Sequence, residues 1–378
     1  MQDKESAVRL RSVDILKGAA ISIIVILHIG IVVKSDVGEP SPIIQALYLG
    51  LISFFIISGY FFKPGRGFRE NMRRRIKVLF LALIMAAIGL SLICFLWCLL
   101  WGQPTNLDDL ALCLERAFTL ERSFLDFDIR APDPRIPWAI CGFSAGYYFL
   151  WVLLFACVIF YAVADRIREN KRLGLLVIAA LLGVTIAYRE LFSFSLPFNL
   201  NLCPIAAVFM IIGMYLAKYE VVEKIESSGL KSGRFWMLFL GSMAATLVMV
   251  FLLPPSIDFD FMDFGNYGGY SAIPYTVEAT SAFIMLICLC FIFSKIPLIS
   301  TLFSKIGKHT LGILLLHLFV AKMILAPFFT FGSDVSLASD FTGPMRYVLA
   351  VVSLAICYLI CAYGPGLVGR LTSNKEKA

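Results

Sequence analysis

The chain has 378 residues, of which 60% are hydrophobic and only 16% are charged, and 33 of them are phenylalanine. A water-soluble protein of this length cannot bury so much apolar surface, so the composition excludes a soluble globular protein and predicts a polytopic membrane protein. The net charge of +7 does not indicate a nucleic-acid partner, because it is concentrated in segments that flank apolar runs.

The apolar segments are long enough to cross a lipid bilayer, which requires roughly 20 predominantly apolar residues. The first segment is too long for a cleavable signal peptide and lacks a small-residue cleavage site, so we expect it to remain as a spanning helix. The predicted fold class is an all-α polytopic membrane protein, a bundle of about ten transmembrane helices. The predicted spans are 12–34, 42–62, 78–101, 143–164, 173–188, 199–217, 235–254, 272–294, 309–331 and 345–366.

Charge in the connecting segments predicts the orientation of the bundle. The connections on one side hold 18 Lys or Arg and six Asp or Glu, whereas the short connections on the other side hold one Arg and eight acids. An excess of Lys and Arg marks the cytoplasmic side, so both termini are predicted to be cytoplasmic. The basic connections are 63–77, 165–172, 218–234 and 295–308, and the acidic ones are 35–41, 189–198, 255–271 and 332–343.

One connection, 102–142, is long, and it is predicted to be extracytoplasmic within a single domain spanning 1–378. It contains an amphipathic stretch and then the proline-rich "IRAPDPRIPW". Such a loop serves as a lid or an acceptor-recognition element, or it simply caps the bundle. Cys113 and Cys141 lie in it, and in an oxidising compartment they either form a disulfide or stay unpaired.

The first predicted span carries ionisable residues that a simple anchor does not need. In "SVDILKGAAISIIVILHIG", Lys17 lies near the cytoplasmic end and His28 follows eleven residues later. At 1.5 Å per residue this spacing places His28 about 16 Å deeper, on the same helix face. Ionisable groups inside a membrane suggest function, although a polar residue bonded between helices is the alternative.

A second histidine, His317, lies within the ninth predicted span, whereas His309 is at its interface and is expected to be solvated or to cap the helix. Two imidazoles without a companion Cys or carboxylate are a thin ligand set, so no metal site is predicted. An imidazole is instead suited to general-base chemistry near neutral pH.

The basic loop "KPGRGFRENMRRRIK", 63–77, holds seven Lys or Arg in fifteen positions. Much of this charge is the ordinary cytoplasmic bias. Arg74 and Lys77, however, stand at the start of a span, where they can turn toward the mouth of the bundle. With Lys17 they would form a cationic entrance for a phosphate-bearing molecule.

These pieces together resemble the acyltransferase 3 family of bacterial membrane acyltransferases, and most of all its fucose 4-O-acetylase branch. "VDILKGAAISIIVILH" resembles the family's opening segment, in which a basic residue, ten residues and the catalytic histidine recur, here as Lys17 and His28. "RRRIKVLF" resembles the family's R-x-x-R element at Arg74 and Lys77. Lysine replaces arginine at Lys17 and Lys77, and so loses bidentate phosphate geometry. Four further matching segments are "FFIISGYFFKP", "GYYFLWVLLF", "LPFNLNLCPIAAVFMIIGMYLAKY" and "IGKHTLGILLLH".

The resemblance implies transfer of an acyl group, usually acetyl from acetyl-CoA, to a carbohydrate hydroxyl in the bacterial cytoplasmic (inner) membrane. Acyl-CoA would be a substrate, and no permanently bound cofactor is expected. His28 would be the base, and the donor phosphates would meet Lys17, Arg74 and Lys77. Polar residues in the outer half of the bundle would bind the acceptor or orient His28: His317, Glu278, Asn199, Asn201, Tyr147 and Trp151. The competing interpretation is an exporter or flippase for a polysaccharide or lipid-linked sugar.

Overall fold

A computed structural model describes residues 10–32, 50–100, 147–192, 196–252, 272–321 and 345–375, with a few residues between 106 and 114. Within these residues every regular element is a helix and there is no β-strand. The all-α class is therefore confirmed for the described part of the chain. Most of the loop 102–142, including Cys113 and Cys141, lies outside it.

The described helices follow one another as α1 (Arg11–Val32), α3 (Ser53–Tyr60), α4 (Gly67–Arg75), the π-helical turn η1 (Ile76–Phe80), α5 (Leu81–Leu100), α8 (Tyr148–Glu169), α9 (Lys171–Leu191), the 3₁₀ segment η4 (Pro197–Leu202), α10 (Cys203–Lys218), α11 (Val221–Ser228), α12 (Gly233–Leu252), α13 (Ala272–Phe293), α14 (Pro297–Gly307), α15 (Thr310–Phe319) and α17 (Met345–Lys375).

Among the described residues, seven helical segments are long and apolar enough to cross a membrane, and Thr310–Phe319 is a shorter apolar helix. The protein is therefore a multi-pass membrane protein. A count of ten spans and the cytoplasmic termini stay predictions. The seven segments are Gly67–Ile93, Tyr148–Glu169, Lys171–Leu191, Pro197–Lys218, Gly233–Phe251, Ala272–Phe293 and Tyr347–Gly364.

All four segments expected as basic connections are themselves partly helical, and 165–172 is helical except at Asn170, where α8 ends and α9 begins. The segment 63–77 folds mostly as α4, because Arg, Glu and Met are good helix formers and no proline interrupts them after Gly67. It then continues through the π-helical turn into α5. The segments 218–234 and 295–308 contain the short helices α11 and α14.

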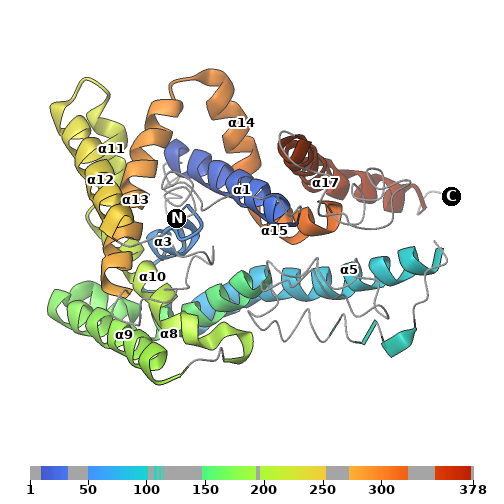
Figure 1. Cartoon of the computed structure of the whole chain (residues 1–378), viewed down its shortest axis with the longest axis horizontal. Helices are drawn as coiled ribbons and strands as arrows, with labels where there is room; N and C mark the ends of the chain where they lie inside the picture. Colours follow the sequence, from blue (N-terminus) through green and yellow to red (C-terminus); the bar gives the residue numbers. More distant parts are fainter. Residues whose placement is uncertain are drawn as a thin grey trace, which may run out of the picture.

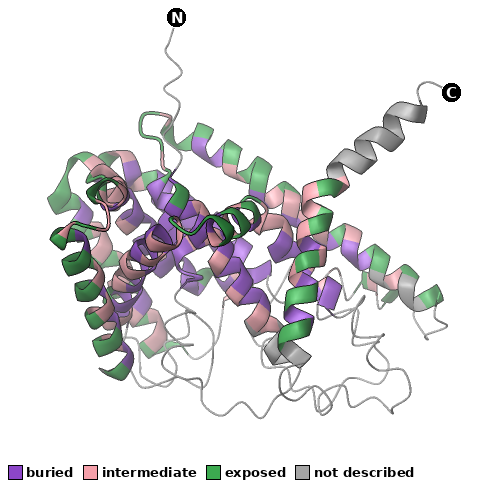
Figure 2. Cartoon of the chain, turned by 90° about the horizontal axis from the view of Figure 1, so that it is seen from above, coloured by how far each residue is buried: buried purple, intermediate pink, exposed green. Residues whose placement is uncertain are grey.

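Helix α1 occupies the middle of the bundle (Figure 1) and packs against α3, α13, α14, α15 and α17. A second group forms around α10, which packs against α3, α8 and α9. Buried residues gather where these helices meet, and exposed residues cover the outward sides of peripheral helices (Figure 2). On α9 the leucines at 175 and 176 are 67% and 66% exposed, which is the pattern of a helix that faces lipid.

Glycines allow two of the central helix pairs to touch backbone to backbone. A Cβ at Gly59 of α3 would overlap the Met210 carbonyl of α10, and a Cβ at Gly213 of α10 would overlap the Ile56 carbonyl of α3. Small residues permit such close approach between membrane helices. Gly18 of α1 and Gly307 of α14 make the same reciprocal arrangement, against the Phe303 and Asp14 carbonyls.

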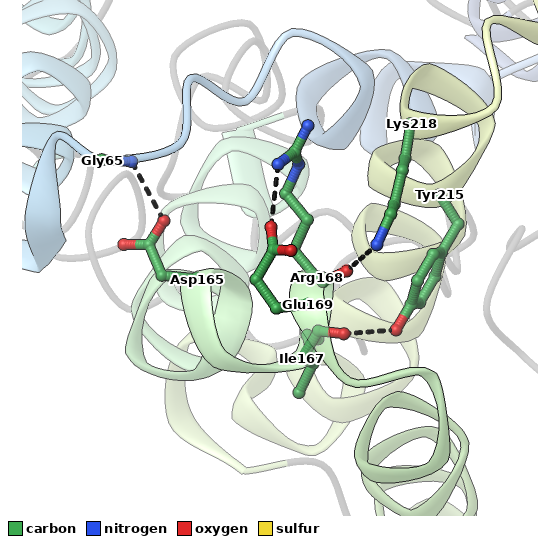
Figure 3. Close-up of polar contacts among 7 residues, drawn as sticks. All are labelled: Gly65, Asp165, Ile167, Arg168, Glu169, Tyr215 and Lys218. Carbon is green, nitrogen blue, oxygen red and sulfur yellow. Dashed lines mark hydrogen bonds and ion pairs between the residues drawn. The ribbon is translucent and has the colours of Figure 1, made fainter.

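The end of α8 that is predicted to be cytoplasmic is held by polar contacts from its neighbours (Figure 3). The last carbonyls of a helix lack intrahelical hydrogen-bond donors, and here side chains from α10 donate to them. These contacts fix α8, α10 and the α3–α4 connection relative to one another. They run from Lys218 to the Arg168 carbonyl, from the Tyr215 hydroxyl to the Ile167 carbonyl at 2.6 Å, and from the Gly65 N–H to the Asp165 carboxylate at 3.2 Å.

Candidate active site

The structure brings the two predicted intramembrane histidines into direct contact. Nδ1 of His28 on α1 lies 2.7 Å from Nε2 of His317 on α15. The two ring planes are 23° from parallel and their centroids are 4.9 Å apart. Because the nitrogens are so much closer than the ring centres, the rings meet edge to edge through these nitrogens. Residues 289 positions apart in sequence therefore form one pair.

The two histidine side chains differ in their solvent exposure. His317 is completely buried, whereas His28 is only partly buried. Nδ1 of His317 lies 2.8 Å from the Leu314 carbonyl oxygen and 3.2 Å from the Ile313 carbonyl oxygen, both on its own helix. Two backbone carbonyls of its own helix thus anchor His317, and His28 is the more exposed member of the pair.

Tyr147, predicted to serve the acceptor, supports the helix that carries His317. Its side chain is fully buried and its hydroxyl donates to the Leu315 carbonyl at 3.1 Å. This contact joins the start of α8 to α15 two residues before His317. Tyr147 therefore bears on the histidine pair through the position of α15.

Lys17 lies on α1 as expected, eleven residues before His28 in the same unbroken helix. Its Nζ is 3.7 Å from the Asp14 carboxylate and 5.3 Å from the centre of the Phe61 ring. The first contact is an ion pair between residues one helical turn apart, and the second is a cation–π contact. Both hold the ammonium beside the end of α3, at the predicted cytoplasmic mouth.

The arginine that turns toward the bundle is Arg75, not the two residues singled out from the sequence. Arg74 and Lys77 are exposed, and the Arg74 guanidinium pairs with Glu70 on its own helix at 2.7 Å. Arg75 is partly buried; its Nε–H donates to the Tyr161 hydroxyl at 2.9 Å, and its Nη2 lies 3.4 Å from the Ser58 carbonyl. The orientation expected for Arg74 and Lys77 is therefore not observed.

The surroundings of Arg75 make it a candidate anion site. Among the described residues, no carboxylate forms an ion pair with this guanidinium. A buried charge is normally paired, so an unpaired guanidinium at the mouth of a bundle suits an anionic ligand. Sequence reasoning missed it because three consecutive arginines look alike, and only the packing of α4 against α8 decides which of them faces inward.

The other polar residues predicted to serve the acceptor lie in two places. Trp151 on α8 is 6% exposed and packs against Phe80, Phe155 and Phe198. Its indole N–H has no hydrogen-bond partner among the described residues. Asn199 follows Phe198 in η4 and is fully buried, and both residues have the left-handed backbone conformation, with φ of 54° and 58°.

Asn201 has a structural role in this segment. Its Oδ1 accepts the Leu196 N–H at 3.0 Å, which closes the turn that enters η4. The side chain that was predicted to meet the acceptor therefore already has a local backbone donor.

Glu278 lies two turns into α13 and is 4% exposed. No described residue donates a hydrogen bond to its carboxyl group or pairs with it; the Ser281 hydroxyl donates to the Glu278 backbone carbonyl instead. Burying an acidic group at this depth in a membrane protein costs free energy, so such a group is by default a candidate functional residue. The structure does not bring it into contact with the histidine pair.

Within the described residues there is no group of three or more His, Cys, Asp or Glu side chains placed to hold a metal ion. The arrangement that the structure does provide is a pair of contacting histidines, with two cations, Lys17 and Arg75, nearer the predicted cytoplasmic end. This geometry fits transfer chemistry between an anionic donor and a hydroxyl acceptor.

Comparison with known families decides the class of chemistry. A model of the acyltransferase 3 family, described as an acyltransferase domain, matches residues 10–363. The chain belongs to the acyltransferase 3 family. No curated protein and no solved structure shows a significant match. The matched range contains both histidines, Lys17 and Arg75, so the whole candidate site of this membrane acyltransferase lies within the family domain.

Proposed function

We propose that this acyltransferase moves an acetyl group from cytoplasmic acetyl-CoA to a hydroxyl of a cell-surface carbohydrate or its lipid-linked precursor, in a bacterial cytoplasmic membrane. The observation that supports the proposal is the 2.7 Å contact between His28 and His317 inside a membrane bundle, with cations nearer one end. The similarity of the opening motif to the fucose 4-O-acetylase branch supports the carbohydrate acceptor.

The donor enters from the cytoplasm, where its phosphates meet Lys17 and Arg75. Arg74 and Lys77 are exposed on the same segment and add positive charge around this entrance. Lys17 precedes His28 by about 16 Å along α1, a distance that an extended pantetheine arm can bridge. The thioester thus reaches His28 while the charged part of CoA stays near the membrane surface.

At the thioester, His28 acts as general base. It takes the proton of the acceptor hydroxyl as the hydroxyl oxygen attacks the thioester carbonyl carbon. The tetrahedral intermediate then collapses, the carbon–sulfur bond breaks, and the leaving thiolate receives the proton from His28. The products are an acyl ester and free CoA thiol, and the imidazole returns to its starting state.

The acceptor reaches His28 from the opposite face. Trp151 and Asn199 offer buried polar groups beside an aromatic cluster, and Glu278 offers a carboxyl group on α13. Tyr147 and Asn201 shape this half of the bundle through their backbone contacts. We assign recognition of the carbohydrate to the first three and support of the site to the other two.

The test is acyl transfer by the purified protein in liposomes, with labelled acetyl-CoA supplied to one face. Mass spectrometry of surface glycans from cells with and without the protein identifies the acceptor by the mass of one acyl group. His28→Ala should abolish transfer, and His309→Ala, at the N-cap of α15, is the matched control. Glycan export that persists without any acyl transfer would favour a carrier and contradict the proposal.

A further inference from the structure

We propose that His317 is a positioning residue that sets the tautomer of His28, so that Nε2 of His28 is the nitrogen that takes the acceptor proton. This inference rests on the proposed function, because it concerns the same base. It follows from the hydrogen bonds of the two imidazoles and from the burial of His317.

The first step is the protonation of His317. Its Nδ1 lies within hydrogen-bond distance of two backbone carbonyl oxygens, at 2.8 and 3.2 Å. A carbonyl oxygen only accepts, so Nδ1 of His317 carries a hydrogen and donates it. His317 is fully buried, and among the described residues no carboxylate pairs with it. A charged imidazolium there would be costly, so the ring is neutral and its Nε2 carries the lone pair.

The second step transfers this assignment to His28. Nε2 of His317 is an acceptor, and it lies 2.7 Å from Nδ1 of His28. The contact is a hydrogen bond only if Nδ1 of His28 donates its proton. A general base is neutral before it takes a proton, and a neutral imidazole has a single N–H, so under the proposed function the lone pair of His28 is on Nε2. The backbone of α15 thereby determines, through His317, which nitrogen of His28 is basic.

The third step concerns the transition state. When Nε2 of His28 takes the hydroxyl proton, His28 becomes an imidazolium that still donates from Nδ1 to His317. That bond then becomes charge-assisted and is stronger than in the resting state. In serine hydrolases a buried carboxylate orients the histidine and stabilises its charged form. Here a neutral imidazole, anchored to carbonyls of its own helix, performs the same two tasks.

The decisive variants are His317→Gln and His317→Leu. The Gln amide oxygen can replace Nε2 as an acceptor, whereas Leu fills the space without any acceptor. We expect His317→Gln to keep kcat within about tenfold of wild type and His317→Leu to lower kcat about a hundredfold or more, both with unchanged donor KM. If His317 only packed the core, apolar Leu would be tolerated at least as well as polar Gln. Equal activity of the two variants, or higher activity of His317→Leu, would overturn the assignment.

A second measurement uses the wild-type protein, so it does not depend on whether a variant folds. The chain has only three histidines, and ¹⁵N-histidine labelling therefore gives a small set of ring-nitrogen resonances. We expect a protonated Nδ1 and an unprotonated Nε2 for His28 at neutral pH, assigned by the loss of signals in His28→Ala. If protein that transfers acyl groups has the opposite tautomer of His28, the role assigned to His317 is refuted while the proposed function stands. Absence of transfer by the wild-type protein would refute the proposed function itself.

Discussion

Replacing Arg75 by Gln tests whether the inward arginine meets the donor. The guanidinium donates to the Tyr161 hydroxyl at 2.9 Å and makes a longer contact of 3.4 Å to the Ser58 carbonyl. It has donors left for a phosphate. A hydrogen bond to a charged group contributes about 1.5–3 kcal/mol, which corresponds to a roughly 10- to 150-fold rise in donor KM. Because this contact is made equally in the ground and transition states, kcat should change little.

Matched controls come from the same segment. Arg74→Gln and Lys77→Gln remove exposed charges, whose interactions are worth about 0–1 kcal/mol, so donor KM should rise less than about fivefold. Tyr161→Phe removes the hydroxyl that receives the Arg75 Nε–H without removing the charge. If Arg75 acted only by tying α4 to α8, Tyr161→Phe would reproduce the effect of Arg75→Gln.

The assay compares acetyl-CoA with an analogue that lacks one phosphate group, in liposomes at constant protein. A phosphate contact predicts that Arg75→Gln raises KM for the complete donor and has a much smaller effect on the analogue that lacks the contacted phosphate. The reasoning is refuted if Arg75→Gln keeps the wild-type KM for acetyl-CoA, or if every phosphate-deleted analogue loses affinity by the same factor as the complete donor.

Three further predictions use separate features of the chain. His28→Ala should lower acyl transfer about a hundredfold or more. Immunoblots should show normal insertion, because one interhelical hydrogen bond in a membrane is worth only about 0.6 kcal/mol on average. Near-normal transfer by this variant would contradict the role of His28 as general base. Gly59→Ala should destabilise the protein by about 1–3 kcal/mol or more through overlap with a backbone carbonyl, whereas Gly89→Ala, which meets nothing within 4 Å, should leave the melting temperature in detergent unchanged. Cysteine labelling from outside should modify position 123 and not position 228, and the reverse result would invert the predicted topology.

The two histidines could be singled out from the sequence, because the position of each within its own helix follows from local sequence patterns. A fixed rise and rotation per residue place Lys17 and His28 on one face of α1, and the apolar run places His317 within another helix. What the sequence did not specify is the 2.7 Å contact between them. That contact depends on how α1 and α15 pack, and no pattern within either helix contains this information.

The arginine run shows a limit of the same reasoning. All three arginines of "RRRIK" lie in the α-helix α4, where successive residues point in different directions, so the packing of α4 against α8 decides which one faces inward. In the structure Arg75 faces Tyr161 while Arg74 and Lys77 are exposed. Asn201 shows another limit, since a buried amide predicted to bind a ligand instead accepts a backbone N–H five residues earlier. Helix packing decided the first case, and local backbone geometry decided the second.

The glycine contact between α1 and α14 connects the packing of the bundle to its chemistry. Gly18 and Gly307 hold the two helices at backbone contact, and each precedes one histidine of the pair by ten residues. Along α1 that spacing is about 15 Å, so a tilt of only about 4° at Gly18 would move His28 by about 1 Å. A misplacement of about 1 Å can cost a hundredfold in rate. Since α1 also packs against α15, the same crossing that excludes side chains at Gly18 and Gly307 constrains the distance between the base and the residue that orients it.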